Sequence, residues 1–351
     1  MGNVYTYLKK SAKDCSSDLF IAAGKVISGK KNGEIIALGV QPLTPEEASK
    51  LVGELYAIAE RPADTYLVRG EDDFSVSVPG VGRFRVSAYR QRGTLAAAIR
   101  VVHFGIPDRR ELGIPDSVMG LADLTSGLAL VTGPAGSGRS ATLACIVDAI
   151  NHQRSAHIIT IEDPIEYLHR DDRSYITQRE LAVDTQSYAA ALRSSLRQAP
   201  DVIVLEELAD EETARLALMA AESGHLVICT LCTLGAVNSI DHITGLFRAE
   251  RQQPLRLQLS KVLKAVVSQQ LLPAQGGGLV PAFEVMYVDG AVRGMIREGR
   301  TEQIGTVIRS FGMSGTESMD DAILKLFKAG RINRETALQF AANGEQLQKK
   351  L

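Results

Sequence analysis

The clearest structural signal in this chain is the stretch "GPAGSGRSAT", residues 133–142. It follows the phosphate-binding pattern G-x-x-x-x-G-K-S/T except at Arg139, which stands where the pattern has Lys. We expect an apolar strand, residues 128–131, directly before it and a helix directly after it. This order of strand, loop and helix points backbone N–H groups at a phosphate. The sequence therefore predicts a nucleotide site in which Ser140 reaches a magnesium ion.

Strands and helices alternate along the chain from Gly127 onward. The apolar runs "LALVTG", "HIITIED", "DVIVLEE" and "HLVICTL" are separated by helical patterns such as "SATLACIVDAINHQ" and "DEETARLALMAAESG". Continuous apolar strands are typical of a parallel sheet that helices cover on both faces. The pattern therefore predicts an α/β fold. Beyond residue 250, "LRLQLSKVLKAVVSQQLL" is predicted to be helical and "PAFEVMYV" to be a short strand.

The first hundred residues have a different texture, rich in strands with one clear helix. That helix is "TPEEASKLVGELYAIA", where Thr44 followed by Glu47 predicts a capping box. Residues 72–102 alternate with period two, and Pro79-Gly80 is expected to break them into a hairpin. We therefore predict an N-terminal domain over residues 1–105, a linker over 106–120, and a second domain with a helical C-terminal part over 121–351.

Composition excludes several classes of protein. The chain has 351 residues, 45% of them hydrophobic and 23% charged, which is an ordinary globular balance. Its formal net charge of −2 gives no overall field that would attract nucleic acid, so we expect no nucleic-acid partner. No apolar run approaches the roughly 18 residues that a membrane-spanning helix needs. We therefore expect a cytoplasmic protein.

The four cysteines, at positions 15, 145, 229 and 232, are too few and too scattered for a disulfide framework. Cys229 and Cys232 form a C-x-x-C, but it lies in an apolar strand pattern and no second pair completes a zinc site. We expect two ordinary buried thiols there.

Acidic residues follow two of the predicted strands. Glu162, Asp163 and Glu166 lie in "TIEDPIEYLHR", where a carboxylate is placed to orient the attacking water or to hold the metal. "APDVIVLEELAD" has the Walker-B form of an apolar strand that ends in acid, with Glu206 and Glu207 as the candidate magnesium ligands.

Taken together, the chain resembles the PilT family of RecA-like hexameric ATPases that power type IV pilus retraction and twitching motility. "VTGPAGSGRS" resembles the Walker A, "TIEDPIEYLH" the Asp box, the segment around "DVIVLEE" the Walker B, and "TLCTLGA" the His box of that family. "AVRGMIRE", residues 291–298, is similar to its A-I-R-N-L-I-R-E motif, which marks retraction ATPases. "SDLF" and "GRFRVSAYRQRG" resemble the N-terminal PAS-like domain.

The resemblance implies a RecA-like P-loop NTPase core, a smaller α+β PAS-like domain, and ATP and Mg²⁺ as ligands. It assigns water activation to Glu166, the Walker-B role to Glu207 and a histidine role to His225. The implied magnesium ligands are Ser140 and Glu207. The implied nucleotide-binding residues are Gly133, Pro134, Ala135, Gly136, Ser137, Gly138, Arg139, Ser140 and Ala141.

The resemblance also implies a ring whose sites lie between subunits. Arg83, Arg85 and Arg100 match N-terminal arginines, some of which act on the neighbouring subunit's nucleotide. The partners implied are other subunits, in a homo-hexamer or a mixed hexamer with a paralogue, and the inner-membrane pilus platform protein. The protein is then expected at the inner face of the cytoplasmic membrane.

Four residues depart from the family pattern, all of them near the chemistry. Arg139 replaces Lys, Cys232 replaces the His-box His, Glu206 replaces Gly, and Ala209 replaces Arg. Each lost transition-state donor typically costs about 10² to 10³ in rate. Two functions therefore stay open: a retraction ATPase, or a nucleotide-binding subunit with impaired hydrolysis that works beside an active paralogue. A third function, that of an assembly or secretion ATPase, is less well supported, because those relatives carry paired C-x-x-C motifs and this chain has only one C-x-x-C.

Overall fold

The computed structural model describes residues 3–13, 17–31, 34–62, 70–102, 105–310 and 315–351. Cys15 lies outside these residues. The chain divides into two compact units, one of residues 1–105 with 166–168 and one of residues 106–165 with 169–351. We describe each unit by itself. Among the described residues, no helix is both long enough and apolar enough to cross a membrane.

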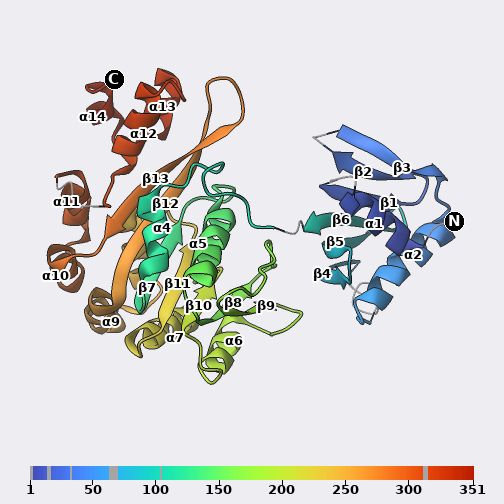
Figure 1. Ribbon diagram of the computed structural model, residues 1–351, viewed down its shortest axis with the longest axis horizontal. Coiled ribbons are helices and arrows are strands. Elements are labelled where there is room, and N and C mark those ends of the chain that lie inside the picture. The colour runs from blue at the N-terminus through green and yellow to red at the C-terminus, as the bar shows by residue number, and fades with distance from the viewer. Residues whose placement is uncertain (1–2, 14–16, 32–33, 63–69, 103–104, 311–314) are drawn as a thin grey trace. The chain divides into compact units, whose positions relative to one another are not determined.

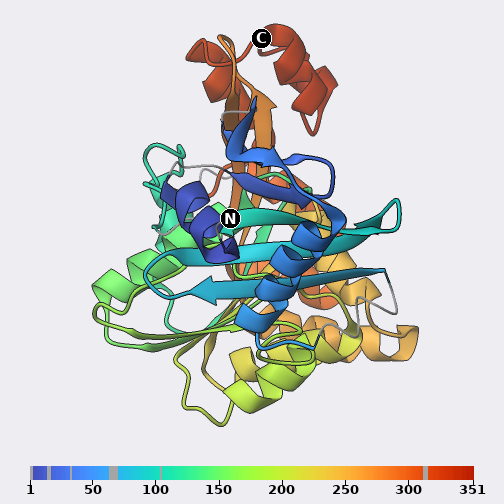
Figure 2. The same cartoon turned by 90° about the vertical axis from the view of Figure 1, so that its right-hand side faces the viewer.

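The N-terminal unit is an antiparallel sheet with the strand order β3-β2-β1-β6-β5-β4. Helices α1 (Val4–Lys13) and α2 (Pro45–Ile58) cover one face and enclose a core with the inward side chains of the strands (Figure 2). The capping box is confirmed, because Thr44 Oγ1 accepts the Glu47 N–H and the Glu47 carboxylate accepts the Thr44 N–H. The strands are β1 (Asp18–Ala22), β2 (Val26–Lys31), β3 (Glu34–Pro42), β4 (Glu71–Val78), β5 (Gly82–Gln91) and β6 (Thr94–Val102).

The predicted linker is not a free connection. Residues 106–120 belong to the second unit, and Ile114 and Val118 are buried in its core. The segment ends in α4 (Asp116–Met119), and the 3₁₀ turn η1 (Gly120–Asp123) follows directly. Its prolines and glycines suggested a linker, but its scattered apolar side chains pack beneath the sheet.

The second unit is built on a sheet with the order β13-β12-β7-β11-β10-β8-β9 (Figure 1). All neighbours are parallel except β13, which runs antiparallel to β12. The strands are β7 (Gly127–Thr132), β8 (His157–Glu162), β9 (Tyr175–Glu180), β10 (Val202–Leu205), β11 (Leu226–Leu231), β12 (Leu263–Pro273) and β13 (Leu279–Tyr287). The α/β prediction is confirmed.

Alternate side chains of the central strands enter two cores, one on each face of the sheet. Ala129 and Val131 of β7 meet α5 (Arg139–Gln153) on one face. Leu128 and Leu130 meet the helices on the other face. Those helices are α6 (Tyr188–Ser195), α7 (Glu211–Glu222), α8 (Ala236–Gly245), α9 (Ala249–Val262), α10 (Gly290–Glu298) and α11 (Ile304–Ser310).

The helix predicted over residues 255–272 is wrong in its second half. Helix α9 ends at Val262, and the chain continues directly as β12. Strand β12 pairs with β7 and thereby satisfies the backbone groups on that strand's second edge. The predicted strand over 281–288 is confirmed within β13, which returns from the turn at residues 274–278. Helices α12 (Met319–Lys328), α13 (Arg334–Phe340) and α14 (Gly344–Gln348) pack on the far end of this hairpin.

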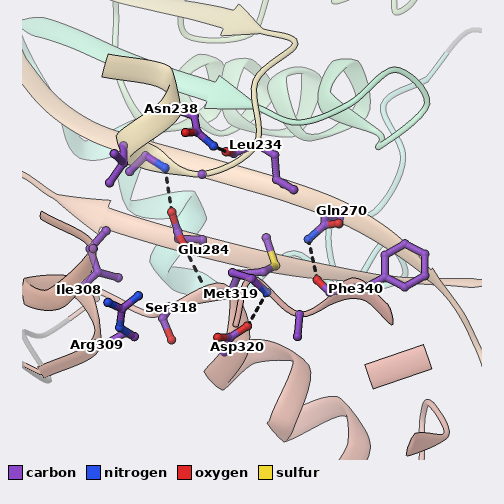
Figure 3. A pocket seen from close by; sticks show the side chains of 16 residues that line it. Leu234, Asn238, Gln270, Glu284, Ile308, Arg309, Ser318, Met319, Asp320 and Phe340 are labelled. Atoms are coloured by element: carbon purple, nitrogen blue, oxygen red, sulfur yellow. Dashed lines mark hydrogen bonds between the residues drawn. The ribbon is translucent and has the colours of Figure 1, made fainter. Parts of the chain in front are cut away.

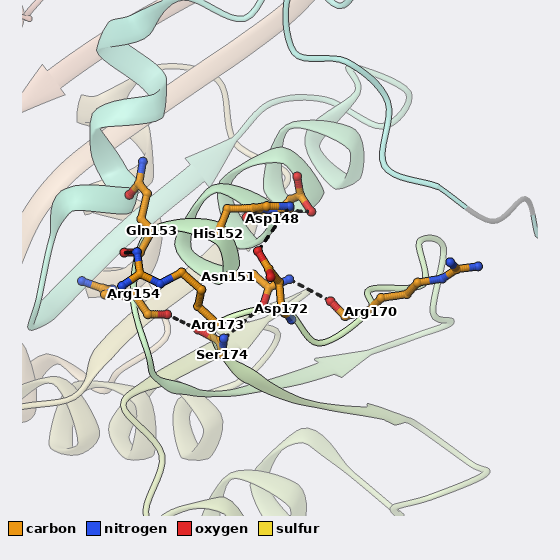
Figure 4. Close-up of polar contacts among 9 residues, drawn as sticks. All are labelled: Asp148, Asn151, His152, Gln153, Arg154, Arg170, Asp172, Arg173 and Ser174. Atoms are coloured by element: carbon orange, nitrogen blue, oxygen red, sulfur yellow. Dashed lines mark hydrogen bonds and ion pairs between the residues drawn. The ribbon is translucent and has the colours of Figure 1, made fainter.

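The connection from β8 to β9 is tied to the end of α5 (Figure 4). Asn151 donates to the Arg170 carbonyl over 2.8 Å and accepts the Asp172 N–H over 3.1 Å. Ser174 Oγ donates to the Arg154 carbonyl over 2.7 Å. These bonds fix the segment that follows the predicted catalytic acids.

Candidate functional site

The loop from Gly133 to Gly138 joins β7 to α5 and has the conformation of a phosphate cradle. Gly133, Gly136 and Gly138 have φ angles of 152°, 77° and 88°, which disfavour any residue with a Cβ. Gly138 precedes Arg139, the first residue of α5. Because the first N–H groups of a helix have no helical acceptor, the start of α5 presents donors and a positive dipole end to an anion. Ser140 lies in that first turn.

Arg139 folds back onto its own loop. Its Nη1 donates to the carbonyls of Gly133 and Leu231 over 2.8 and 2.7 Å and to the Cys232 sulfur over 3.0 Å. The guanidinium therefore links the first residue of the loop to the end of β11. Cys229 is buried as predicted, but the prediction of a second buried thiol is wrong, because Cys232 follows the last residue of β11 and is exposed.

The predicted acids line the carboxyl ends of β8 and β10. Glu162 ends β8, where its Oε1 accepts the Thr160 hydroxyl over 2.5 Å and the Gln178 amide over 3.0 Å. Glu206 and Glu207 directly follow β10. These strands are in register with β11 and β7, so the acids lie at the same edge of the sheet as the phosphate loop.

Tyr188, at the start of α6, faces this acidic edge. Burial raises the pKa of its phenol, and the nearby carboxylates of Glu206, Asp163, Glu207 and Glu162 raise it further. The phenol therefore stays neutral near these carboxylates. This edge has backbone donors after β7 and carboxylates at β10 and β8, two and three strands along the sheet, and fits an anion and a cation together, as in a magnesium–nucleotide complex.

Comparison with known proteins points to one family over most of the chain. A family model described as "Type II/IV secretion system protein" matches residues 111–300. "Type IV pilus retractation ATPase PilT" of Pseudomonas aeruginosa is 39% identical over 331 residues, which are 94% of this chain and 96% of that protein. The "Twitching motility protein" of Neisseria gonorrhoeae is 40% identical over 317 residues, 90% of this chain and 84% of that protein.

The solved structures agree as well. The "Crystal Structure of the Pilus Retraction Motor PilT and Bound ADP" matches with a TM-score of 0.91 and 39% identity, over 99% of this chain and 100% of that one. The chain belongs to the PilT family. The resemblance seen in the sequence motifs is thereby confirmed.

Four residues depart from the PilT-family pattern. Two of them contact one another, and the other two lie apart from that pair. Arg139 and Cys232, which replace Lys and His, contact one another directly. Glu206 crosses from the end of β10 to the Asp box, where its carboxylate accepts the Asp163 N–H. Ala209 is exposed. The added charge of Glu206 is therefore engaged with the backbone next to Glu162.

His225 lies away from this edge. It precedes β11, and its carbonyl accepts the Gly127 N–H at the start of β7. Its Nδ1 contacts the Ala220 carbonyl over 3.0 Å. Since a strand rises about 3.3 Å per residue, the six residues of β11 separate His225 from the loop by about 20 Å. The predicted role of His225 stays a prediction, and its position within the subunit is at the opposite end of β11 from the phosphate loop.

The three arginines with a predicted role at a neighbouring site lie on the sheet face of the N-terminal unit opposite α2. Arg85 pairs directly across the strands with Arg100, and Arg83 occupies the same face two residues away. Arg83 donates to Ser77 over 2.9 Å, and Arg100 forms an ion pair with Asp18 over 3.2 Å. Arg100 therefore has an acidic partner within the unit, whereas Arg85 is exposed beside it and can meet an anionic partner. The trans role stays a prediction.

The residues present can bind a magnesium ion that takes most of its ligands from the nucleotide. Within the described parts of the chain, no three His, Cys, Asp or Glu side chains gather closely enough to hold a metal. Mg²⁺ characteristically binds through one or two protein oxygens together with substrate phosphates. The Ser140 hydroxyl and the Glu207 carboxylate are oxygen ligands of that kind. Glu166 is exposed beyond the end of β8.

Gln269 is absent from the residues that the sequence motifs predict, yet it touches the phosphate loop. Its side chain bonds to Ser137 and Thr142 from the neighbouring strand β12. The signal in the sequence is a polar triplet, Ser268–Gln269–Gln270, inside a strand of otherwise mainly apolar residues.

Proposed function

We propose that this protein is a type IV pilus retraction ATPase, which binds ATP with Mg²⁺ and couples its hydrolysis to pilus disassembly. The observation that supports this most is the shared edge of the sheet, where the phosphate loop and the acids after β8 and β10 come together. The likeness over nearly the whole chain to a PilT crystallised with ADP supports the same reading.

In this proposal the N–H groups at the start of α5 bind the β- and γ-phosphates. Ser140 and Glu207 would hold the magnesium ion, which would supply positive charge against the phosphate oxygens. Glu166 orients a water whose oxygen attacks the γ-phosphorus while the bond to the ADP oxygen breaks. Glu162, at the end of β8, supports this edge of the sheet. The water's proton passes to the carboxylate.

The assembly that we propose is a hexamer, of this chain alone or mixed with a paralogue. Its support is the exposed position of Arg85 on this face of the sheet, where its guanidinium can meet a neighbouring subunit's phosphates. We further propose that the ring works in the cytoplasm, at the inner face of the membrane, on the pilus platform protein.

Steady-state phosphate release by the purified protein tests the proposed activity. Glu207→Gln should lower turnover by about 10² or more, because it removes a charged group of the transition-state machinery. Glu211→Gln is the matched control, since Glu211 pairs with Arg251 on the surface of α7. A wild type that binds ATP but releases phosphate no faster than Glu207→Gln would instead support the impaired accessory subunit.

A further inference from the structure

Strand β12 carries three consecutive polar residues that are all buried. Ser268, Gln269 and Gln270 are 0%, 3% and 7% exposed. Burying such groups without hydrogen bonds is costly, so each is expected to have a specific partner. Strand β12 runs beside β7, and Ser268 pairs with Thr132, the last residue before the phosphate loop. The triplet therefore lies alongside the start of the loop.

The Gln269 amide bridges the loop and α5. Its Nε2 donates to the Ser137 carbonyl over 2.6 Å, and its Oε1 accepts the Thr142 hydroxyl over 2.7 Å. The amide orientation is unambiguous, because a carbonyl can only accept. A single side chain thus fixes both the last turn of the loop and the first turns of the helix.

The bond to Ser137 also sets the direction of a donor. In a trans peptide the C=O of one residue and the N–H of the next point in opposite directions. Because Gln269 holds the Ser137 carbonyl toward β12, the Gly138 N–H is turned away from β12. That N–H belongs to the set that a phosphate-binding loop presents to its ligand.

The phosphate loop also packs closely against Gln269 of β12. A Cβ on Gly133 would lie 2.3 Å from the main-chain oxygen of Gln269, and a Cβ on Gly138 would lie 2.9 Å from its Nε2. Gly133 is therefore required by the β12 backbone as well as by its φ angle, whereas a Cβ on Gly138 would displace the Gln269 amide. The loop and Gln269 form one packed unit.

The side chains of Ser268 and Gln270 form hydrogen bonds with other segments of the chain. Ser268 Oγ accepts the Gly235 N–H over 2.8 Å, and Gln270 Nε2 donates to the Phe340 carbonyl over 3.4 Å. Gln270 lines a cavity of about 310 Å³ on the opposite face, beside Glu284 and Asp320 (Figure 3). Gln270 is thus a matched control of the same type, adjacent in sequence and similarly buried, without a contact to the loop.

We propose that Gln269 is a positioning residue of the nucleotide site, which holds the phosphate loop in its binding conformation before nucleotide arrives. This role rests on the proposed function. A loop that is already ordered binds without the cost of ordering. Because both ADP and ATP place phosphates in the loop, loss of Gln269 should weaken both nucleotides.

The test is isothermal titration of the full chain with ADP, alongside KM and kcat for ATP. Gln269→Met, which keeps the volume and removes both bonds, should raise the ADP Kd about tenfold and raise KM more than it lowers kcat. Gln270→Met should change both constants less than about twofold. Thr142→Val removes one of the same bonds, so its effect should not add fully to that of Gln269→Met.

The outcomes separate a positioning role from a structural one. Equal ADP affinities in Gln269→Met and Gln270→Met, with similar losses of thermal stability, would overturn the inference. If Gln269→Met does not fold, unchanged ADP affinity in Thr142→Val would overturn it instead. A wild type that does not bind ADP would refute the nucleotide site itself, and this role with it, whereas normal wild-type binding with unaffected variants refutes the role alone.

Discussion

At the residue scale, the contact of Arg139 with Cys232 distinguishes this site from a lysine-containing phosphate loop. The guanidinium is broad and planar, and here its Nη1 is bonded to two carbonyls and a sulfur. A histidine at position 232 would place a larger side chain against the Arg139 guanidinium. The two substitutions therefore form one altered unit, in which the cation is held by the protein.

We predict that Arg139→Lys together with Cys232→His raises ATP turnover at least about tenfold, or roughly 1.4 kcal/mol at the barrier. Lys lacks the guanidinium nitrogen that binds these two carbonyls and offers a compact point charge instead, and the imidazole restores a hydrogen-bond donor. The single changes should be non-additive, since the residues touch. Phosphate release by the two single variants and the double variant measures this.

Glu166→Gln in the repaired background should abolish the gain, because the attacking water loses its carboxylate. A wild type that already turns over at about 1 per second or faster would show that the departures are neutral. A double variant that stays inactive would point to Glu206, whose carboxylate holds the Asp163 N–H.

His169 gives the stability a defined pH dependence. Burial lowers the pKa of His169 from 6.5 to about 4, so the folded protein keeps this ring neutral. Between these values the unfolded chain binds a proton that the folded chain does not. The contribution of neutral His169 to the free energy of unfolding is therefore complete above pH 6.5. It falls as the pH drops toward 4, by at most about 3 kcal/mol. His169→Leu should flatten this slope in urea unfolding monitored at several pH values.

His152 is the control, because it titrates in the opposite sense. Its hydrogen bond to the Asp148 carbonyl, and then the carboxylates of Asp148 and Asp172, raise the pKa of this exposed ring (Figure 4). A raised pKa adds stability below 6.5 that is lost as the pH rises through the folded value. His152→Gln should leave the acid slope intact. An acid slope that survives His169→Leu unchanged would contradict the assignment.

At the scale of secondary-structure elements, local signals govern the helix starts. Thr44, Ser187, Asp210, Asp289 and Ser318 all cap the helices that follow them. Each side chain accepts a backbone N–H that the helix itself cannot satisfy. The end of α9 has a different cause, since it is set by pairing of the next residues with β7.

We predict that Thr44→Ala costs α2 about 1 kcal/mol, because it removes the hydroxyl that accepts the Glu47 N–H. Amide hydrogen exchange in the first turns of α2 should then quicken about fivefold, which is the equivalent of that energy. Thr44→Ser retains the acceptor and should exchange nearly as the wild type does. Equal exchange in all three proteins would show that the cap contributes nothing.

At the scale of the whole molecule, the functional unit that we propose is the ring. A single chain has its phosphate loop in one unit and the arginines Arg83, Arg85 and Arg100 in the other. Within the N-terminal unit these cations line one exposed face of the sheet. The proposed assembly brings such a face to the phosphates of a neighbouring site.

Light scattering at micromolar protein with ATP should therefore show a hexamer. Mixing Arg85→Ala with Glu207→Gln protein should recover part of the turnover, because mixed rings contain some sites with both groups intact. Lys50→Ala, on an exposed turn of α2, is the control for the arginine change. Monomer alone in the presence of nucleotide, or no recovery on mixing, would count against sites shared between subunits.

Much of this protein can be read from short stretches of its sequence. The phosphate loop, the alternating strands and helices, the Thr44 cap and the acids after β8 and β10 are local, because glycine spacing, hydrophobic period and capping chemistry act within a few residues. Contacts between distant segments are not local. The strand β12, the packing of residues 106–120, the place of His225 and the Gln269 bridge all depend on distant partners, up to 170 residues away in the case of Ser117 and Tyr287. Such pairings follow from satisfying backbone groups and burying apolar surface across the whole sheet, so they exist only once the chain has folded.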